Sequence, residues 1–115
     1  MSQVDIYHNP SCSKSRQTLD ILRQQGIEAN IIEYLKQPPS SDVLLSILQA
    51  LGIEAHQLLR VKEAAYQQHG LTPNSTQAEI IAAMLASPKL IERPIVVKGD
   101  RARIGRPPET VLEIL

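Results

Sequence analysis

Hydrophobic and polar positions predict a βαβ unit at the start of the chain. Val4 and Ile6 lie in a short β-prone run that ends at the turn-forming residues 8–11. Apolar residues then recur at helical spacing up to Gly26, which predicts a helix over about residues 13–25. Residues 29–34 are again β-prone. A strand, a helix and a strand of these lengths predict a parallel pair with a right-handed crossover.

The middle of the chain has a helical pattern. Pro38 and Pro39 interrupt the chain, and the serines that follow are suited to cap a helix that ends at Gly52. Shorter helical stretches continue, separated by turn-forming residues at 69–73 and 87–88. We interpret about residues 40–90 as a helical insertion.

The last part of the chain predicts a hairpin and a final helix. Residues 95–97 and 102–104 are β-prone and flank a short loop that contains Gly99, which indicates an antiparallel hairpin. Pro107 stands where a last helix would begin. The complete order predicts an α/β protein with a thioredoxin-like, four-stranded mixed sheet. Because 115 residues are too few for two ordinary domains, we expect a single domain over residues 1–115.

The composition of the chain argues against several classes of function. Twelve basic and twelve acidic residues balance, and aromatic residues make up 3% of the chain, so we expect no nucleic-acid partner. The apolar stretches of the chain are far shorter than the roughly 20 residues needed to span a membrane. Residues 1–5 lack the features of a secretory signal, which favours a cytoplasmic location. His56 and His69 lack acidic or cysteine partners at ligand spacing, and we expect no metal.

Cys12, the single cysteine, is the main candidate for chemistry. It falls at the predicted start of the first helix, where free N–H groups and the helix dipole favour a thiolate. His8, Lys14 and Arg16 would add positive charge around the sulfur. A place between two serines and after a proline indicates a polar, accessible thiol and not a core residue. Ser15 occupies the position of the second cysteine of a two-thiol redox motif, so a second thiol must come from elsewhere.

Three arginines stand in contexts that a solvated surface charge would not require. They are Arg60, Arg93 and Arg106. Guanidinium groups bind tetrahedral oxyanions through paired hydrogen bonds, and three of them beside a thiolate would hold a divalent oxyanion. Pro94 opens the third strand, where thioredoxin-like domains usually keep a cis proline. Arg101 and Arg103 alternate with apolar residues on the fourth strand, and we expect them to face solvent.

Four segments together resemble the glutaredoxin-coupled arsenate reductase family. They are residues 7–16, 58–60, 92–97 and 105–109. The resemblance covers essentially the whole chain and implies that Cys12 is the catalytic cysteine and that His8 helps to keep its thiol ionised. It also implies that Arg60, Arg93 and Arg106 bind the oxyanion. The implied reaction is reduction of arsenate to arsenite, with glutathione as co-substrate, glutaredoxin as electron-donor partner and no bound cofactor.

Two other functions stay open beside the reductase. One is a thiol-dependent regulatory module, since the fold family also contains transcriptional regulators that bind RNA polymerase. Those regulators typically carry a Cys-x-x-Cys switch, and Ser15 argues against it. The other is a glutathione-dependent oxidoreductase that acts on protein mixed disulfides or another substrate, which would not need three arginines.

Overall fold

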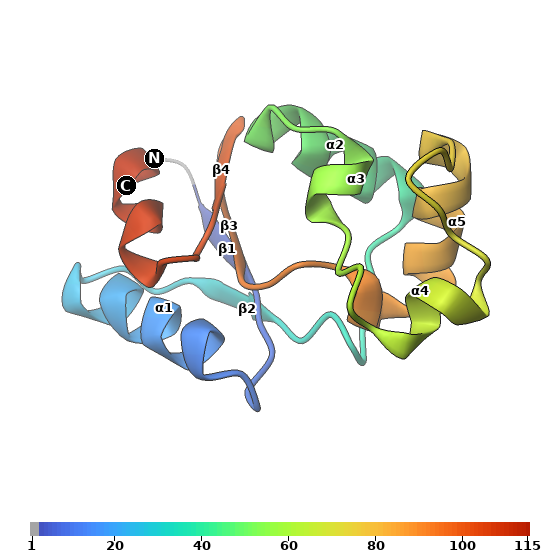
Figure 1. The fold of residues 1–115 in the computed structure, drawn as a ribbon. Coiled ribbons are helices and arrows are strands. Elements are labelled where there is room, and N and C mark those ends of the chain that lie inside the picture. Colours follow the sequence, from blue (N-terminus) through green and yellow to red (C-terminus); the bar gives the residue numbers. More distant parts are fainter. Residues whose placement is uncertain (1–2) are drawn as a thin grey trace. The chain divides into compact units, whose positions relative to one another are not determined.

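The computed structural model describes residues 3–115, which form two compact units. The first unit contains residues 3–37 and 93–115, and the second contains residues 38–92. Figure 1 shows the elements along the chain. Within the described residues, no helix is long and apolar enough to cross a membrane. The expected single domain with a helical insertion stays a prediction.

The first unit is built on a mixed sheet. Its strands are β1 (Val4–Tyr7), β2 (Asn30–Ile32), β3 (Ile95–Lys98) and β4 (Arg101–Ile104). Their order is β2-β1-β3-β4, with β1 parallel to β2 and antiparallel to β3, and β3 antiparallel to β4. The predicted α/β class and the four-stranded mixed sheet are therefore confirmed. β2 is shorter than the β-prone segment 29–34 predicts.

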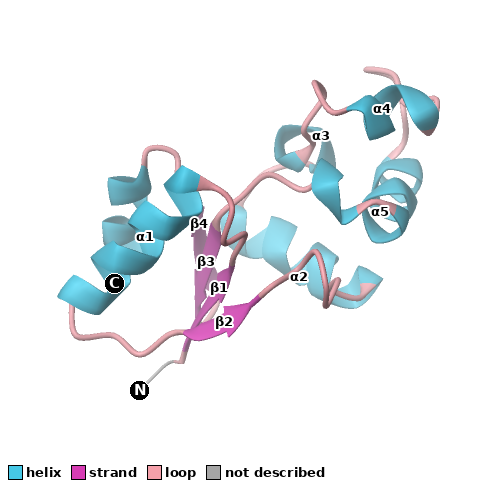
Figure 2. Ribbon diagram, turned by 90° about the horizontal axis from the view of Figure 1, so that it is seen from below, coloured by secondary structure: helices cyan, strands magenta, loops and turns pink. Residues whose placement is uncertain are grey.

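Two helical elements cover one side of this sheet (Figure 2). Helix α1 spans Ser13–Gln24, close to the predicted range, and the 3-10 helix η2 spans Pro108–Ile114. Their apolar side chains form a single buried cluster with β1 and β3, made of Val4, Ile6, Leu19, Leu22, Val96, Val111 and Ile114. Burial of aliphatic side chains between helix and sheet stabilises this unit.

The last helix differs from the prediction in its type and its start. Pro107 is the N-cap and not the first helical residue, and the helix has 3-10 geometry. Characteristic i to i+3 bonds open and close it, from the Thr110 amide to the Pro107 carbonyl and from the Leu115 amide to the Leu112 carbonyl. Short helical segments near a chain end commonly take this tighter form because few i to i−4 bonds are available there.

The second unit is helical. It contains α2 (Ser41–Leu51), α3 (Ala55–Leu58), α4 (Ala64–Gln68), α5 (Gln77–Ala86) and the 3-10 helix η1 (Pro88–Leu90). The Ser40 hydroxyl accepts a hydrogen bond from the Val43 amide at the start of α2, and Thr76 begins α5 with a capping box. Gly52 ends α2 with φ of 69°, a left-handed conformation that favours glycine.

Candidate functional site

Cys12 lies at the junction of a turn and a helix. It is the N-cap of α1, its amide donates to the Asn9 carbonyl at 3.0 Å, and its carbonyl accepts from the Arg16 amide at 3.0 Å. The sulfur is therefore next to the unpaired N–H groups of the first helical turn, as the sequence predicts. The expected accessibility is wrong, because Cys12 is only 8% exposed. Arg106, far along the sequence, lies against the sulfur.

The pKa of the Cys12 thiol is lowered from its ordinary value, although burial, the largest single influence, raises it. The opposing influences are hydrogen bonds from the backbone of Ser15 and Lys14 and the positive charges of Arg93 and Arg106. Together they outweigh burial and favour the thiolate. Lys14 therefore acts on the sulfur through its backbone and not through the side-chain charge that the sequence suggested.

The register of the β3–β4 hairpin brings Arg93 and Arg106 close together. Ile95 at the start of β3 is paired with Ile104 at the end of β4, so the residues just outside the pair are neighbours. The Gly105 amide donates to the Pro94 carbonyl at 2.9 Å. A Cβ on Gly105 would lie 2.8 Å from Cγ of Pro94 and also against Thr18 of α1, so the missing side chain permits this close approach.

Arg106 links β3 to the thiol. Its Nε donates to the Arg93 carbonyl at 2.8 Å, and its Nη2 lies 3.8 Å from Sγ of Cys12. The peptide bonds from Arg93 to Pro94 and from Arg106 to Pro107 are both cis. Two of the three predicted arginines therefore stand beside the predicted nucleophile within the first unit. A thiolate beside two guanidinium groups is an arrangement that can hold an oxyanion close to a nucleophile.

Arg60 belongs to the second unit. Its Nη1 forms a 2.8 Å ion pair with Glu63 and donates to the Lys89 carbonyl at 3.2 Å. Its amide donates to the Leu90 carbonyl at 2.7 Å. These contacts hold the arginine at the antiparallel bridge between Leu59 and Ile91. Its role as an oxyanion ligand stays a prediction.

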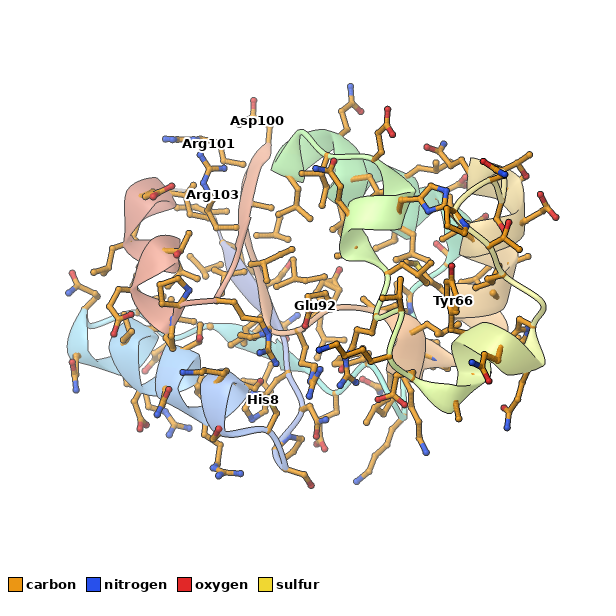
Figure 3. All side chains as sticks on the ribbon, in the orientation of Figure 1. His8, Tyr66, Glu92, Asp100, Arg101 and Arg103 are labelled. Atoms are coloured by element: carbon orange, nitrogen blue, oxygen red, sulfur yellow. The ribbon has the colours of Figure 1, made fainter. Side chains whose placement is uncertain are left out.

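His8 follows β1 and lies beside the N-terminal end of α1 (Figure 3). It is buried, with 6% of its surface exposed, and its Nδ1 is 2.6 Å from Oγ of Ser15. Burial is the main cause that lowers the pKa of His8 below 6.5. The lowered pKa disfavours the positive charge that the sequence predicts for His8 beside the sulfur. Its part in ionising the thiol stays a prediction.

Ser15 is the residue that the sequence analysis missed. It was considered only as the place of an absent second cysteine, whereas its backbone lowers the pKa of the Cys12 thiol and its hydroxyl pairs with His8. One signal for the first contact was available, since the third residue after an N-cap is the one whose amide points back at the capping side chain. The contact with His8 depends on the path of the loop and has no signal in the spacing.

Other charged positions are structural or exposed. Arg101 is exposed and its Nη2 is 3.4 Å from the Glu113 carbonyl. Arg103 is partly buried, and its Nε forms a 2.9 Å ion pair with Glu113, so the expectation of two solvated arginines is confirmed only for Arg101 (Figure 3). Among residues 3–115, no three histidine, cysteine or acidic side chains are grouped so that they could hold a metal ion.

A mixed thioredoxin-like sheet with one thiol at the start of its first helix defines a class of single-cysteine thioredoxin-like proteins. Residues 7–114 match the sequence model of the ArsC family. The chain belongs to the ArsC family.

Similar proteins cover nearly the whole chain. The Escherichia coli K12 protein named uncharacterized protein YfgD is 50% identical over 115 residues, which are 98% of this chain and 97% of that protein. A Haemophilus influenzae protein named arsenate reductase is 50% identical over 114 residues, which are 97% and 98% of the two chains. The solved structure of arsenate reductase from Vibrio cholerae has a TM-score of 0.95, with 49% identity over 99% of this chain and 98% of that one.

Proposed function

We propose that the protein is an arsenate reductase that converts arsenate to arsenite through a covalent adduct on Cys12. The observation that carries the proposal is the pairing of a thiol of lowered pKa with Arg106, 3.8 Å from the sulfur. A relative of the same length and 50% identity named arsenate reductase supports the choice of arsenate among tetrahedral oxyanions.

The proposed first step is attack of the Cys12 thiolate on arsenic(V). A sulfur–arsenic bond forms, one oxygen of arsenate takes up protons, and that oxygen leaves as water. Arg93 and Arg106 stabilise the negative charge of the bound oxyanion. Arg60 is proposed as a third ligand of the oxyanion on the basis of the family resemblance, and His8 as a residue that assists ionisation of the thiol.

Electrons are proposed to come from glutathione with glutaredoxin. Arsenic gains two electrons, and two external thiols lose them and form one disulfide. The sulfur–arsenic bond breaks, the Cys12 thiol is restored, and arsenite leaves. The chain has one cysteine, so it cannot form an internal disulfide and external thiols must supply the electrons. Thiol chemistry of this kind requires a reducing compartment, which the proposal takes to be the cytoplasm. No bound cofactor is required.

The test is NADPH oxidation with glutathione, glutaredoxin and glutathione reductase supplied, with and without arsenate. We expect oxidation that requires arsenate and is lost in Cys12→Ser. The matched control is Ser13→Ala, which removes an exposed hydroxyl from the neighbouring position. Arsenate-independent oxidation that still requires Cys12 would favour a glutathione-dependent oxidoreductase for another substrate. Equal rates in the natural protein and Cys12→Ser would refute the mechanism.

A further inference from the structure

The Ser15 hydroxyl has a restricted set of neighbours. Ser15 is fully buried, at 0% exposure. Within residues 3–115, its Oγ has two hydrogen-bond partners, the Asn9 amide at 3.0 Å and Nδ1 of His8 at 2.6 Å. The Asn9 amide is a donor only, so Oγ accepts that bond and its own proton is left for the second partner.

The direction of the hydrogen bond between Ser15 and His8 then follows from the burial of the Ser15 hydroxyl. If Nδ1 of His8 carried the proton, the Ser15 oxygen would accept two bonds and its hydroxyl proton would be buried without an acceptor. An unsatisfied buried donor of this kind is costly. If the hydroxyl instead donates to Nδ1, all three polar groups are satisfied. The burial and the two distances therefore favour a ring that is unprotonated at Nδ1.

We propose that Ser15 is a positioning residue that holds His8 as a neutral imidazole with its proton on Nε2. Ser15 is also the third residue after the N-cap Cys12, and its backbone lowers the pKa of that thiol, so a single residue in the first turn of α1 lies between the histidine and the thiol. This inference rests on the proposed function for its catalytic meaning. In that reaction, His8 would act as an oriented neutral hydrogen-bond donor and not as a cation.

The surroundings of His8 on balance favour a neutral ring. Burial is the largest influence and lowers the pKa of His8, Glu33 is the next and raises it, and Arg23 and Arg16 lower it. Arg16 is held by a 2.8 Å hydrogen bond from its Nη1 to the Pro10 carbonyl. Positive charge that favours the Cys12 thiolate then comes from Arg93 and Arg106 and not from His8.

The deciding experiment is nitrogen-15 NMR of the histidine ring at about pH 7, which distinguishes the two tautomers and the cation. His8 is assigned by comparison with His8→Gln, since the chain has three histidines. In the natural protein we expect an unprotonated Nδ1 and a protonated Nε2. From the cost of an unsatisfied buried group, this form should exceed the other tautomer by about 5- to 150-fold.

Substitutions at positions 15 and 13 distinguish an effect of the Ser15 hydroxyl from an effect of altered helix geometry. In Ser15→Ala we expect the tautomer ratio to fall at least about fivefold, while Ser13→Ala, an exposed position on the same helix, keeps it. Ser15→Thr retains a hydroxyl and should retain the ratio. A protonated Nδ1 in the natural protein, or an unchanged ratio in Ser15→Ala, would overturn the proposal.

The NMR result does not depend on arsenate reduction, so its failure is distinct from failure of the proposed function. If Ser15→Ala does not fold, the natural protein's spectrum still decides the tautomer. Where reduction is observed, we expect kcat to fall in Ser15→Ala and to recover in Ser15→Thr. A fall of kcat in Ser15→Ala without a change of tautomer would indicate a role in folding only and would overturn the positioning role.

Discussion

Arg106→Ala tests how much one guanidinium contributes to ionisation of the thiol. Its Nη2 lies 3.8 Å from Sγ of Cys12. At that distance, Coulomb's law gives about 1.1 kcal/mol for a dielectric of about 80 and about 2.2 kcal/mol for a dielectric of about 40. Because Arg106 is exposed, values in this water-like range are appropriate. Removing the charge should therefore lower the ratio of thiolate to thiol about 6- to 40-fold at a given pH.

The assay is the rate of iodoacetamide alkylation from about pH 4 to pH 9, a range that spans activated and ordinary thiols. Cys12 is the single cysteine, so the rate reports one group. The titration midpoint should move to higher pH in Arg106→Ala. Arg101→Ala is the matched control, because this exposed arginine of β4 is not among the charges that act on Cys12.

The direction of the shift is the critical result. Loss of a positive charge near a thiol disfavours the thiolate and raises the pKa of the thiol. If the midpoint stays unchanged in Arg106→Ala while circular dichroism shows an intact fold, the guanidinium does not act on the sulfur. The reasoning from the 3.8 Å distance would then be refuted.

Two further predictions concern stability. Burial lowers the pKa of His8 below 6.5, so the unfolded state binds a proton more readily and the free energy of unfolding falls as pH drops from 6.5 toward the folded pKa. Urea unfolding at about pH 7 and about pH 5 should show a smaller fall in His8→Gln. Leu22→Ala empties a fully buried site and should lower the free energy of unfolding by about 2–5 kcal/mol, whereas Leu112→Ala, at an exposed site, should cost much less.

Local patterns were sufficient to predict the order of elements and the place of the nucleophile. Glycine and proline mark the boundaries, and the start of α1 at Ser13 puts Cys12 at the N-cap. Apolar alternation on β4 was also informative, since Ala102 is fully buried. These features depend on residues close together in the sequence, where spacing and geometry are directly related.

The properties of the site that were not predicted depend on distant residues. Cys12 is buried and Arg106 lies against its sulfur, and the spacing around Cys12 contains no sign of that contact. Burial also lowers the pKa of His8 and so disfavours the expected charge, although the sequence places His8 in a polar turn. Exposure and hydrogen-bond direction follow from tertiary packing, so they were accessible only from the structure.

The pairing of β1 with β3 has a consequence for how the protein is made. Val4 of β1 is paired with Lys98 of β3, and Tyr7 is paired with Ile95. The two central strands of the sheet therefore come from opposite ends of the chain. Residues 38–92, which form the second unit, lie between these partners in sequence. Contacts of such high contact order form late, because a long loop must close first.

Synthesis on the ribosome proceeds from the N-terminus, so β1 and β2 emerge long before β3. During that interval one edge of β1 has no strand to pair with, and an unpaired edge is a surface for aggregation. The contiguous second unit can fold as it emerges, because its partners are local. The length of segment 38–92 therefore sets the time for which that edge of β1 waits for its partner strand.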